Sequence, residues 1–141
     1  MSLDFTSSRL ARASVGIIVA GFFVFLIGLF PGLIQLDVTS GLGILQIATF
    51  NAGITLMTIG AYIYMYATRH RALPPRLRED VGLRLMATGV VICYVTGFAD
   101  ILGIGTHFGA NGPPLFGLLQ AGGVSFGVCV IVVGIGVYSR R

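Results

Sequence analysis

Four long apolar runs constrain this chain more than any other feature of its sequence. They cover residues 14–36, 42–67, 81–103 and 116–138. Each is close to the roughly 20 residues that a helix needs to cross about 30 Å of hydrocarbon. Strands of a membrane β-barrel would be about half as long and would alternate apolar and polar residues. The runs therefore predict an all-α integral membrane four-helix bundle, with one transmembrane domain over residues 1–141.

The composition excludes a water-soluble globular protein. Hydrophobic residues make up 55% of the chain and charged residues only 10%, which leaves too little polar surface to cover a soluble fold. The first run follows Arg9 and Arg12, as a secretory signal would. It is longer than the 7–15 apolar residues typical of a signal and has no clear cleavage site of small residues, so we expect it to remain as a membrane span.

The arginines predict how the chain is oriented. All nine basic residues are Arg, and they precede the first run, follow the last run, or lie in or beside the central segment, residues 68–80. Short loops rich in Arg or Lys stay on the cytoplasmic side. We therefore expect a multi-pass protein of the cell membrane, with both termini and the central loop in the cytoplasm. The central anchors are Arg69, Arg71, Arg76, Arg78 and Arg84; Glu79 and Asp80 are expected to cap the third helix.

The second and fourth runs match each other when they are aligned 74 positions apart. The matched pairs are Gly43 and Gly117, Leu45 and Leu119, Gln46 and Gln120, Gly53 and Gly127, Gly60 and Gly134, and Tyr64 and Tyr138. These matches indicate two helical hairpins related as a parallel repeat, about an axis along the membrane normal. Glycine and leucine are abundant here, so chance matching is the alternative explanation.

Glycines recur at helical spacing in three of the four runs. Small residues on one helix face let backbones approach closely, and this packing helps membrane helices associate. The general abundance of glycine in membrane helices is the competing explanation. The residues expected at helix contacts are Gly53, Gly60, Gly89, Gly97, Gly123, Gly127 and Gly134.

Few polar residues could carry chemistry. Asp100 lies near the outer end of the third run, and an ionisable residue within a membrane span is a candidate functional site. It could also be a helix-end residue that reaches water. Asn51, Thr55 and Thr58 form a stripe on the second helix that could make interhelical hydrogen bonds or line a polar path. The complete candidate polar or ion site is Asp100, His107, Asp37, Gln46, Asn51 and Gln120.

Several classes of function are not expected. Neither histidine lies in a span, where a haem ligand would be needed. Cys93 and Cys129 both fall near the middle of the bilayer and could be neighbours, but they lack a redox-type spacing. The glycine pairs lack the context of a nucleotide-binding loop, and no metal motif is present. We therefore predict no enzyme, no cofactor, no metal site and no nucleic-acid partner.

Two functions remain open. The first is a non-catalytic membrane protein, either an accessory or scaffold subunit of a larger membrane assembly or a homo-oligomer packed through its glycine faces. Its partners would be the lipid bilayer and other membrane subunits or copies of itself. The second is a small ion- or proton-coupled transporter or channel that uses Asp100 and the polar stripe of the second helix.

Overall fold

The computed structural model describes residues 2–30, 44–68, 76–99 and 117–140. Regular structure within these ranges is entirely helical and contains no strand. Each helix is long and apolar enough to cross a membrane, which confirms the prediction of an all-helical chain with four candidate spans. The helices are α1 (Ser2–Leu29), α2 (Ile44–Thr68), α3 (Leu77–Gly97) and α4 (Leu118–Ser139).

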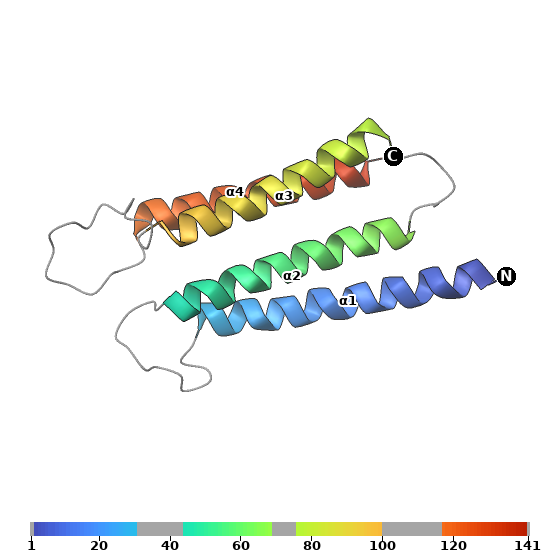
Figure 1. Ribbon diagram of the computed structural model, residues 1–141, viewed down its shortest axis with the longest axis horizontal. Coiled ribbons are helices and arrows are strands. Elements are labelled where there is room, and N and C mark those ends of the chain that lie inside the picture. The colour runs from blue at the N-terminus through green and yellow to red at the C-terminus, as the bar shows by residue number, and fades with distance from the viewer. Residues whose placement is uncertain (1, 31–43, 69–75, 100–116, 141) are drawn as a thin grey trace, which may run out of the picture.

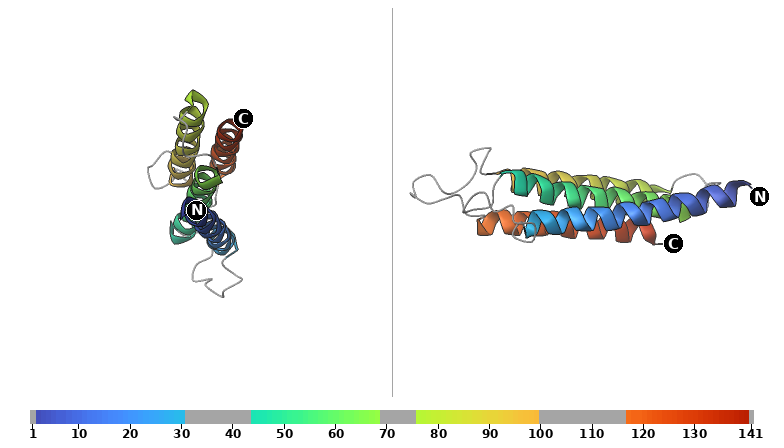
Figure 2. Two further views of the ribbon diagram at one scale, coloured as in Figure 1. Left: turned by 90° about the vertical axis from the view of Figure 1, so that its right-hand side faces the viewer. Right: turned by 90° about the horizontal axis from the view of Figure 1, so that it is seen from below.

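The helices form two hairpins that lie side by side. Helices α1 and α2 make hairpin 1, and α3 and α4 make hairpin 2 (Figure 1). Viewed along its length, the molecule has α2 in the middle, with α1 on one side and hairpin 2 on the other (Figure 2). Helix α2 contacts both α3 and α4. Hairpin 1 therefore joins hairpin 2 through α2.

Both ends of α1 differ from the bounds of the first apolar run. The helix begins at Ser2 rather than at residue 14, and its amino-terminal turns project beyond the other helices (Figure 1). It ends at Leu29, with the Phe30 N–H donating to the Leu26 carbonyl at 2.8 Å. Pro31 explains this end, because proline disfavours helical backbone at the residue before it.

Helix α3 begins at Leu77 rather than at Val81, so the second part of the central segment is helical. Its N-cap is Arg76, whose side chain makes no capping hydrogen bond. Glu79 and Asp80 lie within the first turn instead of at the cap. They still stabilise the helix start there, because carboxylates interact favourably with the positive end of a helix dipole.

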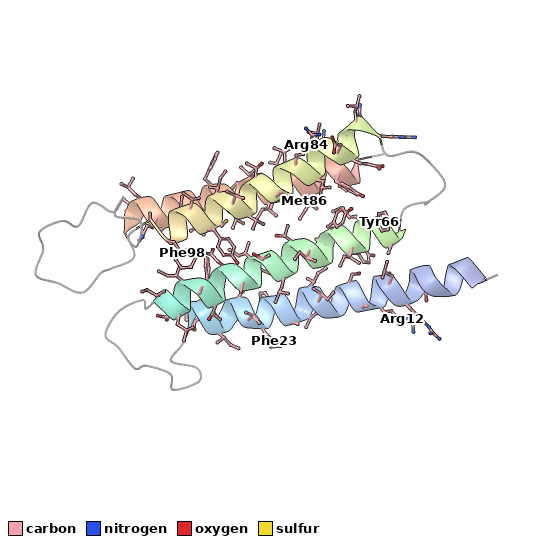
Figure 3. The ribbon with its side chains drawn as sticks, viewed as in Figure 1. Arg12, Phe23, Tyr66, Arg84, Met86 and Phe98 are labelled. Carbon is pink, nitrogen blue, oxygen red and sulfur yellow. The ribbon has the colours of Figure 1, made fainter. Side chains whose placement is uncertain are left out.

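Charged residues of the described helices gather at one end of the molecule. They lie within residues 9–12, 76–84 and at 140, close to both marked chain ends (Figure 1). Arg12 and Arg84 mark this end, whereas Phe98 lies toward the opposite end (Figure 3). The helices have 21 to 28 residues and are therefore about 32 to 42 Å long. Outside this charged end, their described residues carry no charge.

Within each hairpin the helices meet in the same register. Gly53 of α2 packs on Phe25 of α1, and Gly127 of α4 packs on Cys93 of α3. The two contacts correspond, because each residue of α3 lies 68 positions after its counterpart in α1, and each residue of α4 lies 74 positions after its counterpart in α2. Other corresponding contacts are Gly21 with Met57 and Gly89 with Ile131, and Gly60 with Ile18 and Gly134 with Met86.

The core lies where α2 meets hairpin 2. Ile54 of α2 is buried with Cys93, Val124 and Ile131 from the two helices of hairpin 2. Partly buried apolar side chains extend this cluster, among them Phe25 and others from α2, α3 and α4. The outer surface is also apolar, as expected for helices surrounded by lipid. Phe23 of α1 is 60% exposed and points away from the other helices (Figure 3).

Candidate functional site

Of the six predicted polar-site residues, three fall in the described helices. Asn51 and Gln120 are buried, and Gln46 is half-buried near the start of α2. Asp37, Asp100 and His107 lie outside the described residues, as do the anchors Arg69 and Arg71. Of the three described residues, Asn51 is completely buried and is taken as the centre of the candidate site.

Asn51 lies at the contact between the hairpins and is completely buried. Its amide packs against Gly97 of α3: a Cβ atom placed on Gly97 would lie 2.7 Å from the Asn51 Nδ2. Glycine at position 97 thus makes room for the amide. Neither the Nδ2 nor the Oδ1 of Asn51 has a hydrogen-bond partner among the described residues. An unpaired amide in an apolar interior costs about 1–3 kcal/mol, so Asn51 is a costly residue at this position.

One turn further along α2, a pair of hydroxyl groups crosses between the hairpins. The Thr55 Oγ1 lies within hydrogen-bond distance, 3.3 Å, of the Tyr94 Oη on α3. The same threonine donates to the Asn51 carbonyl at 2.9 Å. Thr55 and Tyr94 therefore link α2 to α3 by a polar contact next to Asn51.

The remaining threonine of the polar stripe, Thr58, and the nearby Thr49 each bond within their own helix. Thr58 donates to the Ile54 carbonyl at 2.8 Å, and Thr49 donates to the Leu45 carbonyl at 2.7 Å. This local bonding satisfies each hydroxyl without a second helix or a ligand. Of the stripe residues, Asn51 alone has side-chain polar atoms without a partner among the described residues.

Gln120 has a local structural role. It is the third residue of α4, and its Oε1 accepts a hydrogen bond of 2.9 Å from the N–H of Gly117, the N-cap. This bond satisfies a backbone donor that the helix itself leaves free. Its Nε2 has no partner among the described residues. Gln120 and Asn51 therefore each bury an amide nitrogen without a described partner. The capping bond accounts for the presence of Gln120 at its position.

The predicted glycine contacts fall mainly between the helices of each hairpin. A Cβ atom on Gly89 would lie 2.6 Å from the Gly127 carbonyl oxygen, and one on Gly134 would lie 2.8 Å from the Gly82 carbonyl. Gly53 and Gly60 of α2 face α1, and Gly123 faces Thr96 of α3. Gly97 differs, because it faces α2 across the hairpin boundary.

The two cysteines do not lie together. Cys93 is completely buried, and its thiol is 3.6 Å from the Val124 carbonyl oxygen that accepts its hydrogen bond. Cys129 is exposed on the outward face of α4. The expectation that they could be neighbours is therefore wrong, because Cys93 of α3 is buried in the core whereas Cys129 lies on the exposed side of α4. Within the described helices, no three His, Cys, Asp or Glu residues approach as a metal site would require.

Among the described anchors, Arg84 pairs with Asp80 at 2.9 Å, one turn apart on α3. Both side chains are well exposed. Arg76 and Arg78 lie beside them at the start of α3 and are also exposed. These arginines can reach lipid headgroups or water, which suits a helix end at the membrane surface.

No protein-family model, curated protein or solved structure matches the chain.

Proposed function

We propose that this chain is a non-catalytic integral membrane protein that assembles laterally with other membrane helices. It acts as an accessory or scaffold subunit, or as a homo-oligomer. One observation carries the proposal: α4 has small residues on two faces, and among the described residues only one of these two faces is packed against another helix. Gly127 and Gly134 pack tightly on α3, whereas a Cβ atom on Gly122 or Gly136 would meet nothing within 4 Å.

The second face of α4 is suited to contact with another helix. Lipid tails are as apolar as Leu or Val, so membrane helices associate through close van der Waals packing. Small residues allow this packing because backbones can approach each other. The outward face of α4 presents such residues along its length, with Ser125 and Cys129 exposed between the two open glycines.

We propose that both termini and the segment between the hairpins are cytoplasmic, in the cell membrane. The support is the gathering of described arginines at the end that holds both termini, combined with the tendency of Arg-rich loops to stay inside. The two hairpins are proposed to be a parallel repeat. The corresponding glycine contacts, with constant offsets of 68 and 74 positions, support a common origin beyond the sequence matches alone.

Purification from native membranes in a mild detergent tests the assembly. Light scattering should give a discrete mass above that of a 14.9 kDa monomer, or mass spectrometry should show another membrane subunit at constant stoichiometry. A monodisperse monomer that carries ion flux in liposomes would overturn the proposal.

A second function, a small ion- or proton-coupled transporter or channel, is favoured by Asn51. Its buried amide has no described partner and lies beside the Thr55 and Tyr94 hydroxyls, as a polar step in a transport path would. On this proposal Asp100 carries the charge, and Asp100→Asn abolishes flux in liposomes while assembly stays intact. If neither wild type nor variant shows flux above empty liposomes, the transporter is ruled out.

A further inference from the structure

Helix α2 uses two faces. One packs on α1, and the other docks on hairpin 2. On the docking face, Asn51 packs against Gly97 and Thr55 contacts Tyr94. Near the end of the helix, the Tyr62 ring lies 6.0 Å from the Tyr138 ring of α4. The face of α2 that joins the hairpins is thus defined by Asn51, Thr55 and Tyr62, which are spaced four and seven residues apart.

The constant register of the hairpins identifies the counterpart of this face on α4. Adding 74 to positions 51, 55 and 62 gives Ser125, Cys129 and Gly136. Ser125 and Cys129 are exposed, and the space beside Gly136 is open. Hairpin 2 therefore has the equivalent of the α2 docking face, and nothing within the described chain occupies it.

The counterpart of the receiving face lies on α1. On α3, Tyr94 and Gly97 contact α2, and Val90 packs on the buried cluster that contains Ile54 of α2. Subtracting 68 from positions 90, 94 and 97 gives Phe22, Leu26 and Leu29. Phe22 is 48% exposed, Leu29 is 43% exposed, and Leu26 between them is half-buried. Helix α1 thus presents large apolar side chains outward where the corresponding part of α3 is covered by α2.

We infer that the outward face of α4 (Ser125, Cys129, Gly136) docks on the outward face of α1 (Phe22, Leu26, Leu29) of a second copy of this chain. The contact repeats between copies the arrangement that joins α2 to α3 within the chain. This inference rests on the proposed function, since it names the partner and the surfaces of the assembly.

Shape and direction both support the pairing. Small side chains on α4 leave room for Phe and Leu side chains on α1, and neither face carries a charge. The helices α1 and α4 of adjacent copies run antiparallel when both copies have the same orientation in the membrane, as α2 and α3 do within the chain (Figure 1). The described arginines at one end of the molecule favour this same orientation for every copy.

The contact joins two different faces, so it is heterologous. Each copy then offers one α4 face and one α1 face, and repetition produces a closed ring when the rotation closes. A dimer with α4 against α4 would instead use one face twice. Cross-linking separates the two arrangements.

The test pairs positions 29 and 125, the counterparts of Gly97 and Asn51, which lie in direct contact. Leu29→Cys and Ser125→Cys are combined in a Cys129→Ser background, in which Cys93 stays buried. Membranes are oxidised with copper phenanthroline and run on a non-reducing gel. The double variant should give a ladder of covalent dimers and larger species, whereas each single variant should stay monomeric. Added to the double variant, Gly136→Leu should reduce the ladder at least tenfold while the unfolding temperature of the monomer is unchanged, because position 136 is open.

Each other outcome overturns the inference in a distinguishable way. Dimers from Ser125→Cys alone, without a ladder, indicate an α4 to α4 contact. No covalent product from a protein that light scattering shows to be oligomeric means that other faces associate, and the proposed function survives. No covalent product from a monodisperse monomer removes the proposed function as well.

Discussion

The backbone of Gly89 faces the carbonyl oxygen of Gly127 so closely that a methyl group on Gly89 would lie 2.6 Å from that oxygen. The obstacle is backbone, and it belongs to a helix that is itself packed on α2. Neither helix can yield without disturbing the next contact.

Gly89→Ala should therefore destabilise hairpin 2. Overpacking of this kind costs about 1–3 kcal/mol. Unfolding in detergent, followed by circular dichroism as a denaturing detergent is added, measures the change. Gly16→Ala is the matched control, because a Cβ atom there meets nothing within 4 Å and position 16 lies on neither proposed contact face. Equal stability of the two variants would show that the helices of hairpin 2 are further apart than described.

Asn51→Leu should leave stability unchanged or raise it by as much as about 1–3 kcal/mol. Leucine has nearly the shape of asparagine, and the substitution removes amide atoms that are buried without a described partner. The same unfolding assay measures the effect. A loss of more than about 1 kcal/mol would mean that Asn51 bonds to a group outside the described residues or to a bound ligand.

Asp80→Asn should change stability by no more than about 0.5 kcal/mol, because the ion pair with Arg84 is exposed and links residues one turn apart. The small effect should shrink further in high salt, which screens exposed charges. Unfolding of both proteins at low and high salt checks this. A large effect that resists salt would place the pair in an apolar environment.

Labelling from each side of the membrane should place the two ends of α4 in different compartments. Leu118→Cys and Ser139→Cys, each in a Cys129→Ser background, put a thiol at an exposed position near each end of that helix. A membrane-impermeant maleimide added to intact cells should label position 118, and position 139 should react only in inverted vesicles. The reverse pattern would invert the proposed topology.

Much of the fold follows from hydropathy, since four apolar runs of the right length have one sensible architecture in a bilayer. Helix ends were less predictable. No signal in the sequence before the first apolar run indicates that α1 begins at Ser2 rather than at residue 14. At the other end, Pro31 accounts for the end of the helix at Leu29. Helix α3 begins at Leu77 with Glu79 and Asp80 in its first turn, whereas the sequence pattern predicts that these two residues cap a helix starting at Val81.

The arrangement of the helices could not be predicted. The glycine pattern indicated close contacts but could not say that Gly53 meets α1 while Gly97 meets α2, because every face is apolar and lipid competes equally for each. The Thr55 and Tyr94 contact was missed for the same reason. The 74-position match held the one usable signal, since it relates the docking face of α2 to the open face of α4.

The length of α1 has a practical consequence for structure determination. A helix of 28 residues is about 42 Å long, so about 12 Å of it extends past a hydrocarbon layer about 30 Å thick. A small protein enclosed by detergent offers electron cryomicroscopy little to align. A folded marker domain joined to the start of α1 through continuous helix would be held rigidly outside the micelle, and could provide the particle mass and shape for alignment.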